Sequence, residues 1–302
     1  MNALRYAVLL AALSLGLSQQ ARAQDFSDAR IVTERLADGL YALFGQGEGV
    51  IAGNIIASIG DQGVLLIDDQ FPEIAPKYKA AIRELGGGDI DLVVNTHWHF
   101  DHADGNKLLG PEGVWIVAHD EARRMMMRDN KINLVSQVID QPAFGSDALP
   151  VFTYERSMRL HFNGQAIDLL HFGPAHTTGD TAVIFRGSNV VHLGDVFNNG
   201  GYPFIDADNG GTLSGVVDFC QAVLDRIDES AIVVAGHGPV SDYAGLRDYA
   251  AMLRTIRDRM QSLVGSGATL QQVIAARPTA EWDDVRGDPA QLIDRAYAGM
   301  TR

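Results

Sequence analysis

The chain has 302 residues, of which 46% are hydrophobic and 21% are charged, a balance typical of a globular protein with a full hydrophobic core. Its formal net charge is −14, and a chain this acidic is not expected to bind the phosphate backbone of a nucleic acid. The one cysteine, Cys220, excludes an internal disulfide and is predicted to lie in the core face of a helix.

The N-terminal segment has the pattern of a secretory signal peptide. Arg5 precedes an apolar stretch (7–17), and Ala21-Arg22-Ala23 forms a small-x-small cleavage site. The sequence therefore predicts a signal peptide over residues 1–23 and a single domain over residues 24–302. Removal of two arginines and no acid would change the net charge from −14 to −16. We expect export to a bacterial periplasm without membrane insertion, because no other stretch approaches about 18 apolar residues.

The first part of the remaining chain is rich in strand patterns. Strands are predicted over residues 30–44 (a hairpin), 50–59, 64–67, 92–94 and 114–117, and helices over residues 72–85 and 121–129. A glycine-rich stretch, Gly45 to Gly49, is either a flap over a site or a simple hairpin connection. The stretch from Lys131 to Pro150 lacks periodicity and is predicted to cover the surface near the site.

The second part repeats this order of strands followed by helices. Strands are predicted over residues 155–160, 166–172, 182–185, 190–193 and 232–235, and helices over residues 213–227, 241–263, 268–276 and 289–298. Two similar halves of this kind fit an α/β fold in which two sheets pack face to face with helices outside, an αβ/βα sandwich.

The chain is organised around Thr96-His97-Trp98-His99-Phe100-Asp101-His102, which directly follows the apolar run Leu92-Val93-Val94. Strand side chains alternate between faces, so His97 and His99 can point the same way. Asp101 and His102 follow where the backbone must turn into a short helix. This spacing can supply two ligands to one metal ion and two to a second ion close by. A chance cluster of solvated histidines is disfavoured, because these groups are costly to bury beside a core strand.

Three further candidate ligands, His176, Asp195 and His237, each lie where an apolar run meets a glycine-containing turn. Glycine lets the backbone approach closely and leaves the ligand free to point inward. Asp180 could orient the imidazole of His176 or cap a turn. The remaining histidines are predicted to be structural: His119, His161, His171 and His192.

These motifs resemble the metallo-β-lactamase superfamily of binuclear metallohydrolases over residues 36–240. The resemblance implies a four-layer αβ/βα sandwich with its site at one edge between the sheets. It also implies a role for each candidate. The first metal ion would be held by His97, His99 and His176, the second by Asp101, His102 and His237, and Asp195 would bridge both ions, as in glyoxalase II-like hydrolases.

Imidazole and carboxylate donors suit zinc, and also iron or manganese. Two ions about 3.5–4 Å apart can share a water and lower its pKa, and Asp101 would be the catalytic residue that orients this nucleophile or accepts its proton. The expected substrate is a small-molecule carbonyl compound, with hydrolysis of a β-lactam amide as the first interpretation. Two positions depart from the main β-lactamase branch: Asp195 stands in place of a cysteine ligand, and Asn198 in place of a lysine.

Three alternatives remain open. The ligand set resembles lactone, ester and thioester hydrolases more closely than β-lactamases. An iron-dependent oxygenase resembling persulfide dioxygenases would use part of the same motif, and a metal-stabilised binding protein would use it without turnover. Substrate choice is expected to depend on the loops 45–54, 131–150 and 198–211, in which Tyr202 and Phe204 either contact the substrate or pack the loop. The sequence predicts no particular oligomeric state.

Overall fold

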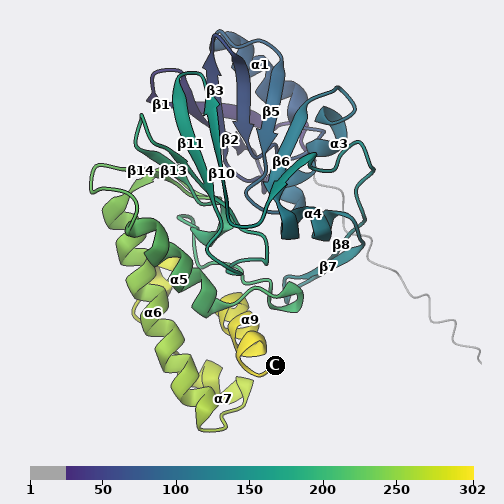
Figure 1. Cartoon of the computed structure of the whole chain (residues 1–302). Helices are drawn as coiled ribbons and strands as arrows, with labels where there is room; N and C mark the ends of the chain where they lie inside the picture. Colours follow the sequence, from purple (N-terminus) through teal and green to yellow (C-terminus); the bar gives the residue numbers. More distant parts are fainter. Residues whose placement is uncertain (1–24) are drawn as a thin grey trace, which may run out of the picture.

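The computed structural model describes residues 25–302, so the predicted signal peptide lies outside the described residues. Two β-sheets pack face to face, and helices cover the outer face of each (Figure 1). The predicted αβ/βα sandwich is confirmed. Within residues 25–302, no helix combines the length and the apolar character needed to cross a bilayer.

The first sheet has seven strands, of which the first four pair antiparallel and the last four pair parallel. In spatial order they are β1 (Arg30–Ala37), β2 (Leu40–Gln46), β3 (Ile55–Gly60), β4 (Gly63–Ile67), β5 (Ile90–Val94), β6 (Trp115–His119) and β9 (Phe152–Tyr154). Helix α1 (Ala75–Glu84) covers the outer face, because its buried residues Ala75, Tyr78 and Ile82 recur at helical spacing.

Short elements connect the last strands of the first sheet, between β5 and β6 and between β6 and β9. They are α2 (Phe100–Ala103), α3 (Asn106–Leu109), α4 (Asp120–Met126) and a separate two-stranded sheet of β7 (Asn130–Asn133) and β8 (Val138–Gln141).

The second sheet has six strands, and its β13 and β14 pair parallel. In spatial order they are β10 (Ser157–Phe162), β11 (Gln165–Leu170), β12 (Ala182–Phe185), β13 (Val190–His192), β14 (Ile232–Val234) and β15 (Ser241–Asp242). The helices of this half are the 3-10 turns η1 (Gly194–Val196) and η2 (Ala207–Asn209), then α5 (Leu213–Leu224), α6 (Tyr243–Gly265), α7 (Leu270–Ala275), α8 (Asp283–Arg286) and α9 (Ala290–Met300).

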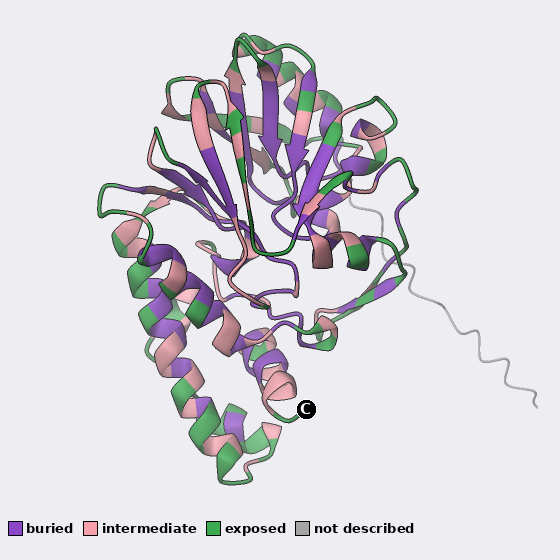
Figure 2. Cartoon of the chain, viewed as in Figure 1, coloured by how far each residue is buried: buried purple, intermediate pink, exposed green. Residues whose placement is uncertain are grey.

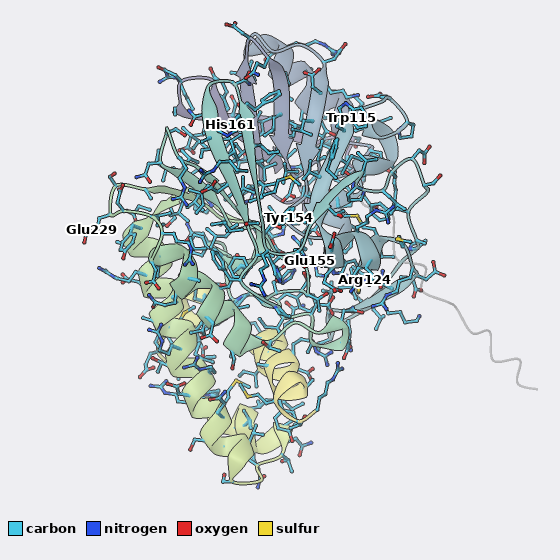
Figure 3. All side chains as sticks on the ribbon, in the orientation of Figure 1. Trp115, Arg124, Tyr154, Glu155, His161 and Glu229 are labelled. Carbon is cyan, nitrogen blue, oxygen red and sulfur yellow. The ribbon has the colours of Figure 1, made fainter. Side chains whose placement is uncertain are left out.

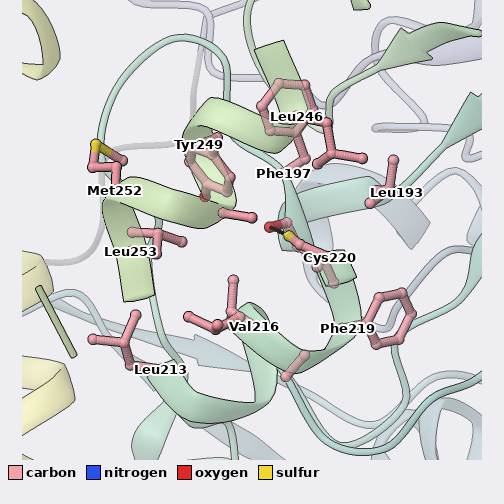
Figure 4. Close-up of a cluster of buried hydrophobic side chains, with 14 of the residues drawn as sticks. Leu193, Phe197, Leu213, Val216, Phe219, Cys220, Leu246, Tyr249, Met252 and Leu253 are labelled. Carbon is pink, nitrogen blue, oxygen red and sulfur yellow. Dashed lines mark hydrogen bonds between the residues drawn. The ribbon is translucent and has the colours of Figure 1, made fainter. Parts of the chain in front are cut away.

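Apolar side chains fill the space between the layers, as the run of buried residues along the central strands shows (Figure 2). Leu65 and Val117 of the first sheet pack with Leu169 and Phe185 of the second. Helices α5 and α6 pack on the outer face of the second sheet through a cluster that contains Cys220 (Figure 4). The predicted core position of this cysteine is confirmed, and burial raises the pKa of its thiol to about 12.

The structure corrects several predicted bounds. Residues 50–54 form a loop, because β3 begins only at Ile55. The helix expected after the histidine motif is split into α2 and α3. The stretch from Lys131 to Pro150 contains the β7–β8 hairpin, whose strands bury too few apolar residues to give a periodic signal. The short elements β9, β15 and α8 and the turns η1 and η2 were not predicted, and the helix expected from residue 241 begins only at Tyr243, after β15.

Candidate metal centre

Seven polar side chains gather at one edge of the sandwich, where parallel strands end. The parallel pairs β4–β5 and β13–β14 bring their carboxyl ends to the same edge of each sheet. All seven predicted ligands meet there in two groups, and in each group the potential ligand atoms lie within 4.8 Å of one another. The first group is His97, His99 and His176, and the second is Asp101, His102, Asp195 and His237.

In the first group, each imidazole donates its outer N–H to a protein acceptor: His97 Nδ1 to the Thr96 hydroxyl at 3.1 Å, His99 Nε2 to Asp206 at 2.9 Å, and His176 Nδ1 to the Phe204 carbonyl at 2.8 Å. These bonds fix the tautomers, so the three inner ring nitrogens carry lone pairs. Nδ1 of His99 and Nε2 of His176 lie 2.9 Å apart, and Nε2 of His97 is buried with no hydrogen-bond partner. Facing lone pairs repel unless a cation lies between them, so the group fits a metal ion.

The second group combines two imidazoles with carboxylates. His102 Nδ1 donates to Asp68 at 2.7 Å, and its Nε2 lies 3.0 Å from Oδ1 of Asp195 and 3.3 Å from Nε2 of His237. Nε2 of His237 lies 3.1 Å from Oδ2 of Asp101. Burial opposes protonation of both imidazoles, but the carboxylates outweigh it. They raise the pKa of His102 well above its usual range and that of His237 to about 10.

Asp195 lies between the two groups. Its Oδ1 faces His102 and is 3.4 Å from Nε2 of His237, while its Oδ2 is 3.7 Å from Nε2 of His176. Burial acts to raise its pKa, but His237 and His102 hold that pKa well below its usual range. Glycine is required at position 236, because a Cβ on that residue would lie 2.0 Å from Oδ1 of Asp195 and would displace the carboxylate.

The donors of this site fit a borderline or hard divalent cation. The seven candidates offer imidazole nitrogens and carboxylate oxygens without a thiolate, a set that suits zinc, iron and manganese. Their role as metal ligands stays a prediction.

Two buried acids that the sequence interpretation missed orient these ligands. Asp68 accepts hydrogen bonds from His102 and from the backbone and hydroxyl of Thr96, and Asp206 accepts one from His99. Asp68 could have been found, because it directly follows the apolar run of β4, a neighbour of β5. Asp206 lies in a loop without periodicity and gave no signal.

Asp180 does not orient His176. Its carboxylate accepts hydrogen bonds from the backbone N–H and the hydroxyl of Thr177, so it caps a turn. His192 is buried and bonded to backbone groups of Asn54 and Gly194, in agreement with a structural role.

The other three histidines also lie outside both groups. His119 accepts from the Glu121 N–H and donates to the Glu155 carbonyl, and His171 donates to the Asp180 carbonyl. His161 is exposed on β10 next to the β10–β11 turn, at the end of that hairpin remote from the site (Figure 3).

A cavity of about 730 Å³ adjoins the second group. Its lining includes His237 and, from the glycine-rich stretch and the residues after it, Gly45, Val50 and Ile51. Ile51 is a large apolar side chain that is 64% exposed, so this loop presents apolar surface to the cavity. The loop therefore borders the site, as a flap would.

The two aromatic residues of the 198–211 loop have different surroundings. The Tyr202 hydroxyl lies 3.0 Å from Asp283 and 3.2 Å from the Thr279 carbonyl, so this side chain packs the loop. The Phe204 ring lies beside two imidazoles, with its centroid 6.0 Å from that of His99 and 5.7 Å from that of His176.

The fold and the site define an αβ/βα sandwich with a two-part histidine–aspartate centre at its edge. The sequence model described as the metallo-beta-lactamase superfamily matches residues 50–258. The chain belongs to the metallo-β-lactamase superfamily.

Individual relatives are distant. The 2,4-dinitroanisole O-demethylase subunit alpha of Nocardioides sp. (strain JS1661) is 24% identical over 147 residues, which are 48% of this chain and 41% of the relative. The chain therefore matches less than half of that protein.

Solved structures share the fold. The DIM-1 metallo-beta-lactamase superposes with a TM-score of 0.59 at 19% identity, covering 75% of this chain and 98% of its own. A metallo-beta-lactamase from Pontibacter korlensis superposes with a TM-score of 0.60 at 17% identity, covering 74% of this chain and 99% of its own.

Proposed function

We propose that the chain is a binuclear metal-dependent hydrolase. His97, His99 and His176 would hold one ion, Asp101, His102 and His237 a second, and Asp195 would bridge them. The observation that supports this assignment is the convergence of five imidazoles, four of which have their outer ring nitrogen engaged by a protein acceptor: His97, His99, His102 and His176. Zinc is the first candidate metal, and iron or manganese would accept the same donors.

Bound metal ions supply Lewis acidity and lower the pKa of a coordinated water. Oδ2 of Asp101, beside His237, would accept the proton of the attacking water. Asp68 and Asp206 keep His102 and His99 in the tautomers that leave their inner nitrogens free. Water would be the nucleophile, so the mechanism requires no serine or cysteine.

The first substrate to consider is a β-lactam amide. Membership of the superfamily and the predicted signal peptide support it, because export would place the enzyme where β-lactams arrive. We likewise propose a periplasmic location, which N-terminal sequencing of the mature protein from a periplasmic extract would test.

A neutral lactone or ester is the second candidate, and the cavity favours it. Of the residues that line the cavity, only Glu34 and His237 are ionisable, and the others include Val32, Phe44 and Val50. The lining therefore has no lysine or arginine to pair with the carboxylate that β-lactams carry.

Metal analysis combined with a substrate panel tests the proposal. The panel is a chromogenic cephalosporin, a penicillin, a homoserine lactone, a thioester and 2,4-dinitroanisole, the compound in the name of the curated relative. Two zinc ions with opening of the cephalosporin would support a β-lactamase, and opening of the lactone alone would support the second candidate. One iron with oxygen uptake would contradict the hydrolase in favour of a dioxygenase. Bound metal without turnover of any compound would point to a binding protein.

Asp195→Ala provides the matching test within the chain. Loss of the carboxylate between the two groups should abolish turnover and leave the fold intact, because the side chain lies at the rim of the cleft and is 15% exposed. Full activity of this variant would refute the bridging role.

A further inference from the structure

The first histidine group is held from outside by one loop, residues 198–211. Asp206 accepts the hydrogen bond from Nε2 of His99 at 2.9 Å, and the Phe204 carbonyl accepts the one from Nδ1 of His176 at 2.8 Å. The Asp206 N–H also donates to the His176 carbonyl at 3.0 Å. Two of the three imidazoles thus depend on the position of this loop.

The loop is in turn attached to the C-terminal helices, which lie beyond the residues 50–258 that the family model matches. Asp208, within η2, accepts a hydrogen bond from Nη1 of Arg295 at 2.9 Å and forms an ion pair with Arg302. The Arg295 side chain is 11% exposed and that of Asp208 33%, so the arginine is held within the fold while its partner lies at the surface.

Apolar contacts and further hydrogen bonds complete the attachment. Ile205 of the loop belongs to the same buried cluster as Leu292 and Ile293 of α9. At the other end of the loop, the Tyr202 hydroxyl contacts Asp283 of α8, and Nη1 of Arg286 donates to the Asn198 carbonyl at 3.3 Å. Helices α8 and α9 therefore hold both ends of the loop.

The path from α9 to the histidine group is short. Asp208 is two residues from Asp206, and the Asn209 side chain donates to both carboxylate oxygens of Asp206 at 2.9 and 3.0 Å. A shift of η2 would therefore move the acceptor that fixes the tautomer of His99.

We infer that α8 and α9 together form a clamp for the first metal site, and that Arg295 of α9 is a positioning residue that acts through Asp208 and Asp206 on His99. This inference rests on the proposed metal centre. The part of the site that lies within the family match is thus supported by a segment outside that match, and metal affinity at the first group depends on this segment.

Zinc titration of the metal-stripped, full-length protein tests the clamp. Two reference variants identify the binding steps: Asp206→Ala marks the first group, and His237→Ala marks the second. Arg295→Met should weaken zinc binding at the same step as Asp206→Ala and leave the other step unchanged. The expected loss of affinity is about tenfold, the lower end of the range for loss of a hydrogen-bond partner of a metal ligand. Arg295→Lys, which keeps the charge, should restore part of the affinity.

Arg259→Met is the matched control. Arg259 forms a two-point ion pair with Glu281 in the same region but does not contact the loop, so its loss should leave both zinc-binding steps unchanged. If Arg295→Met fails to fold, Tyr202→Phe removes the attachment to Asp283 and should weaken the same first step.

Unchanged zinc affinity in a folded Arg295→Met or Tyr202→Phe variant would overturn the clamp. Equal weakening of both steps would overturn it as well, because it would show that α9 only stabilises the fold. Absence of zinc binding by the wild-type protein is a different result, which would overturn the metal centre itself and the clamp with it.

Discussion

Replacement of Asp68 by asparagine should show how much this carboxylate contributes to folding stability and how much it contributes to metal binding. Asp68 is fully buried and accepts hydrogen bonds from the Thr96 N–H at 2.7 Å, the Thr96 hydroxyl at 2.8 Å and Nδ1 of His102 at 2.7 Å. Asparagine keeps one acceptor oxygen and replaces the other by an NH₂ donor. With the oxygen on the Thr96 N–H, the NH₂ group takes the place of Oδ2 and faces both the Thr96 hydroxyl and His102. His102 must then carry its proton on Nε2.

The expected magnitudes differ for the two properties. Folding loses the charged acceptor of two hydrogen bonds, those from the Thr96 hydroxyl and from His102, and one such bond corresponds to about 1.5–3 kcal/mol of unfolding free energy. In this variant, Nε2 of His102 carries a proton and is not free to bind a metal ion. Loss of the hydrogen-bond partner of a ligating histidine lowers metal affinity by about 10–100-fold, or about 1.4–2.8 kcal/mol.

Urea unfolding of the metal-free protein and zinc titration measure the two effects separately. Asp168→Asn is the matched control, because Asp168 is also a buried acid but pairs with Arg159 and Arg186 away from the site. This control should lose stability and keep its zinc affinity. An Asp68→Asn variant that binds zinc as tightly as the wild type would refute the tautomer argument.

Two further substitutions test the site directly. His97→Ala removes the buried, unpartnered Nε2 and should abolish turnover and weaken zinc binding at the first group. The control His161→Ala, at an exposed position on β10, should change neither property. Metal analysis and the substrate panel measure both, and retained activity of His97→Ala would count against the assignment. Gly53→Ala places a Cβ 2.3 Å from the His102 ring and should therefore displace this imidazole. Zinc titration should show affinity weakened by about tenfold or more. Unaltered zinc affinity would mean that His102 is not held at this position.

The sequence was sufficient to predict the sandwich and to bring the seven candidate ligands together. The reason is physical: each ligand follows a strong apolar run, and the order of strands and helices implies that such runs end at a common edge. His176, Asp195 and His237 could be selected because the central motif supplied a reason for metal ligands nearby.

The supports of the site were harder to predict, because they depend on tertiary contacts. Asp206 orients His99 from a loop without a periodic pattern, and the loop is held by Arg295 from a helix far along the chain. For Asp180 the sequence left two roles open, and the local hydrogen bonds from Thr177 show that its carboxylate caps a turn.

The two histidine groups respond differently to pH in the metal-free protein. Burial, together with the neighbouring imidazoles, lowers the pKa of His97 well below its usual range, and burial together with His99 lowers that of His176. Both are therefore neutral at pH 7 and ready to bind a cation. In the second group, the carboxylates raise the pKa values of His102 and His237, so these imidazoles hold protons.

This difference predicts a pH-dependent order of zinc loading. Zinc must displace the proton of His237, whose pKa of about 10 is raised from about 6.5, so affinity at the second group should rise with pH and binding should release protons. The same proton stabilises the metal-free fold fully below about pH 6.5, and this contribution is lost as the pH rises through about 10. Calorimetric zinc titration in buffers of different ionisation enthalpy, at acidic and at alkaline pH, measures both the affinity and the protons released. At acidic pH the second group should bind zinc weakly, because the pKa values of His102 and His237 are raised, whereas those of His97 and His176 in the first group are lowered. Equal pH dependence of the two steps would contradict this account of the charges.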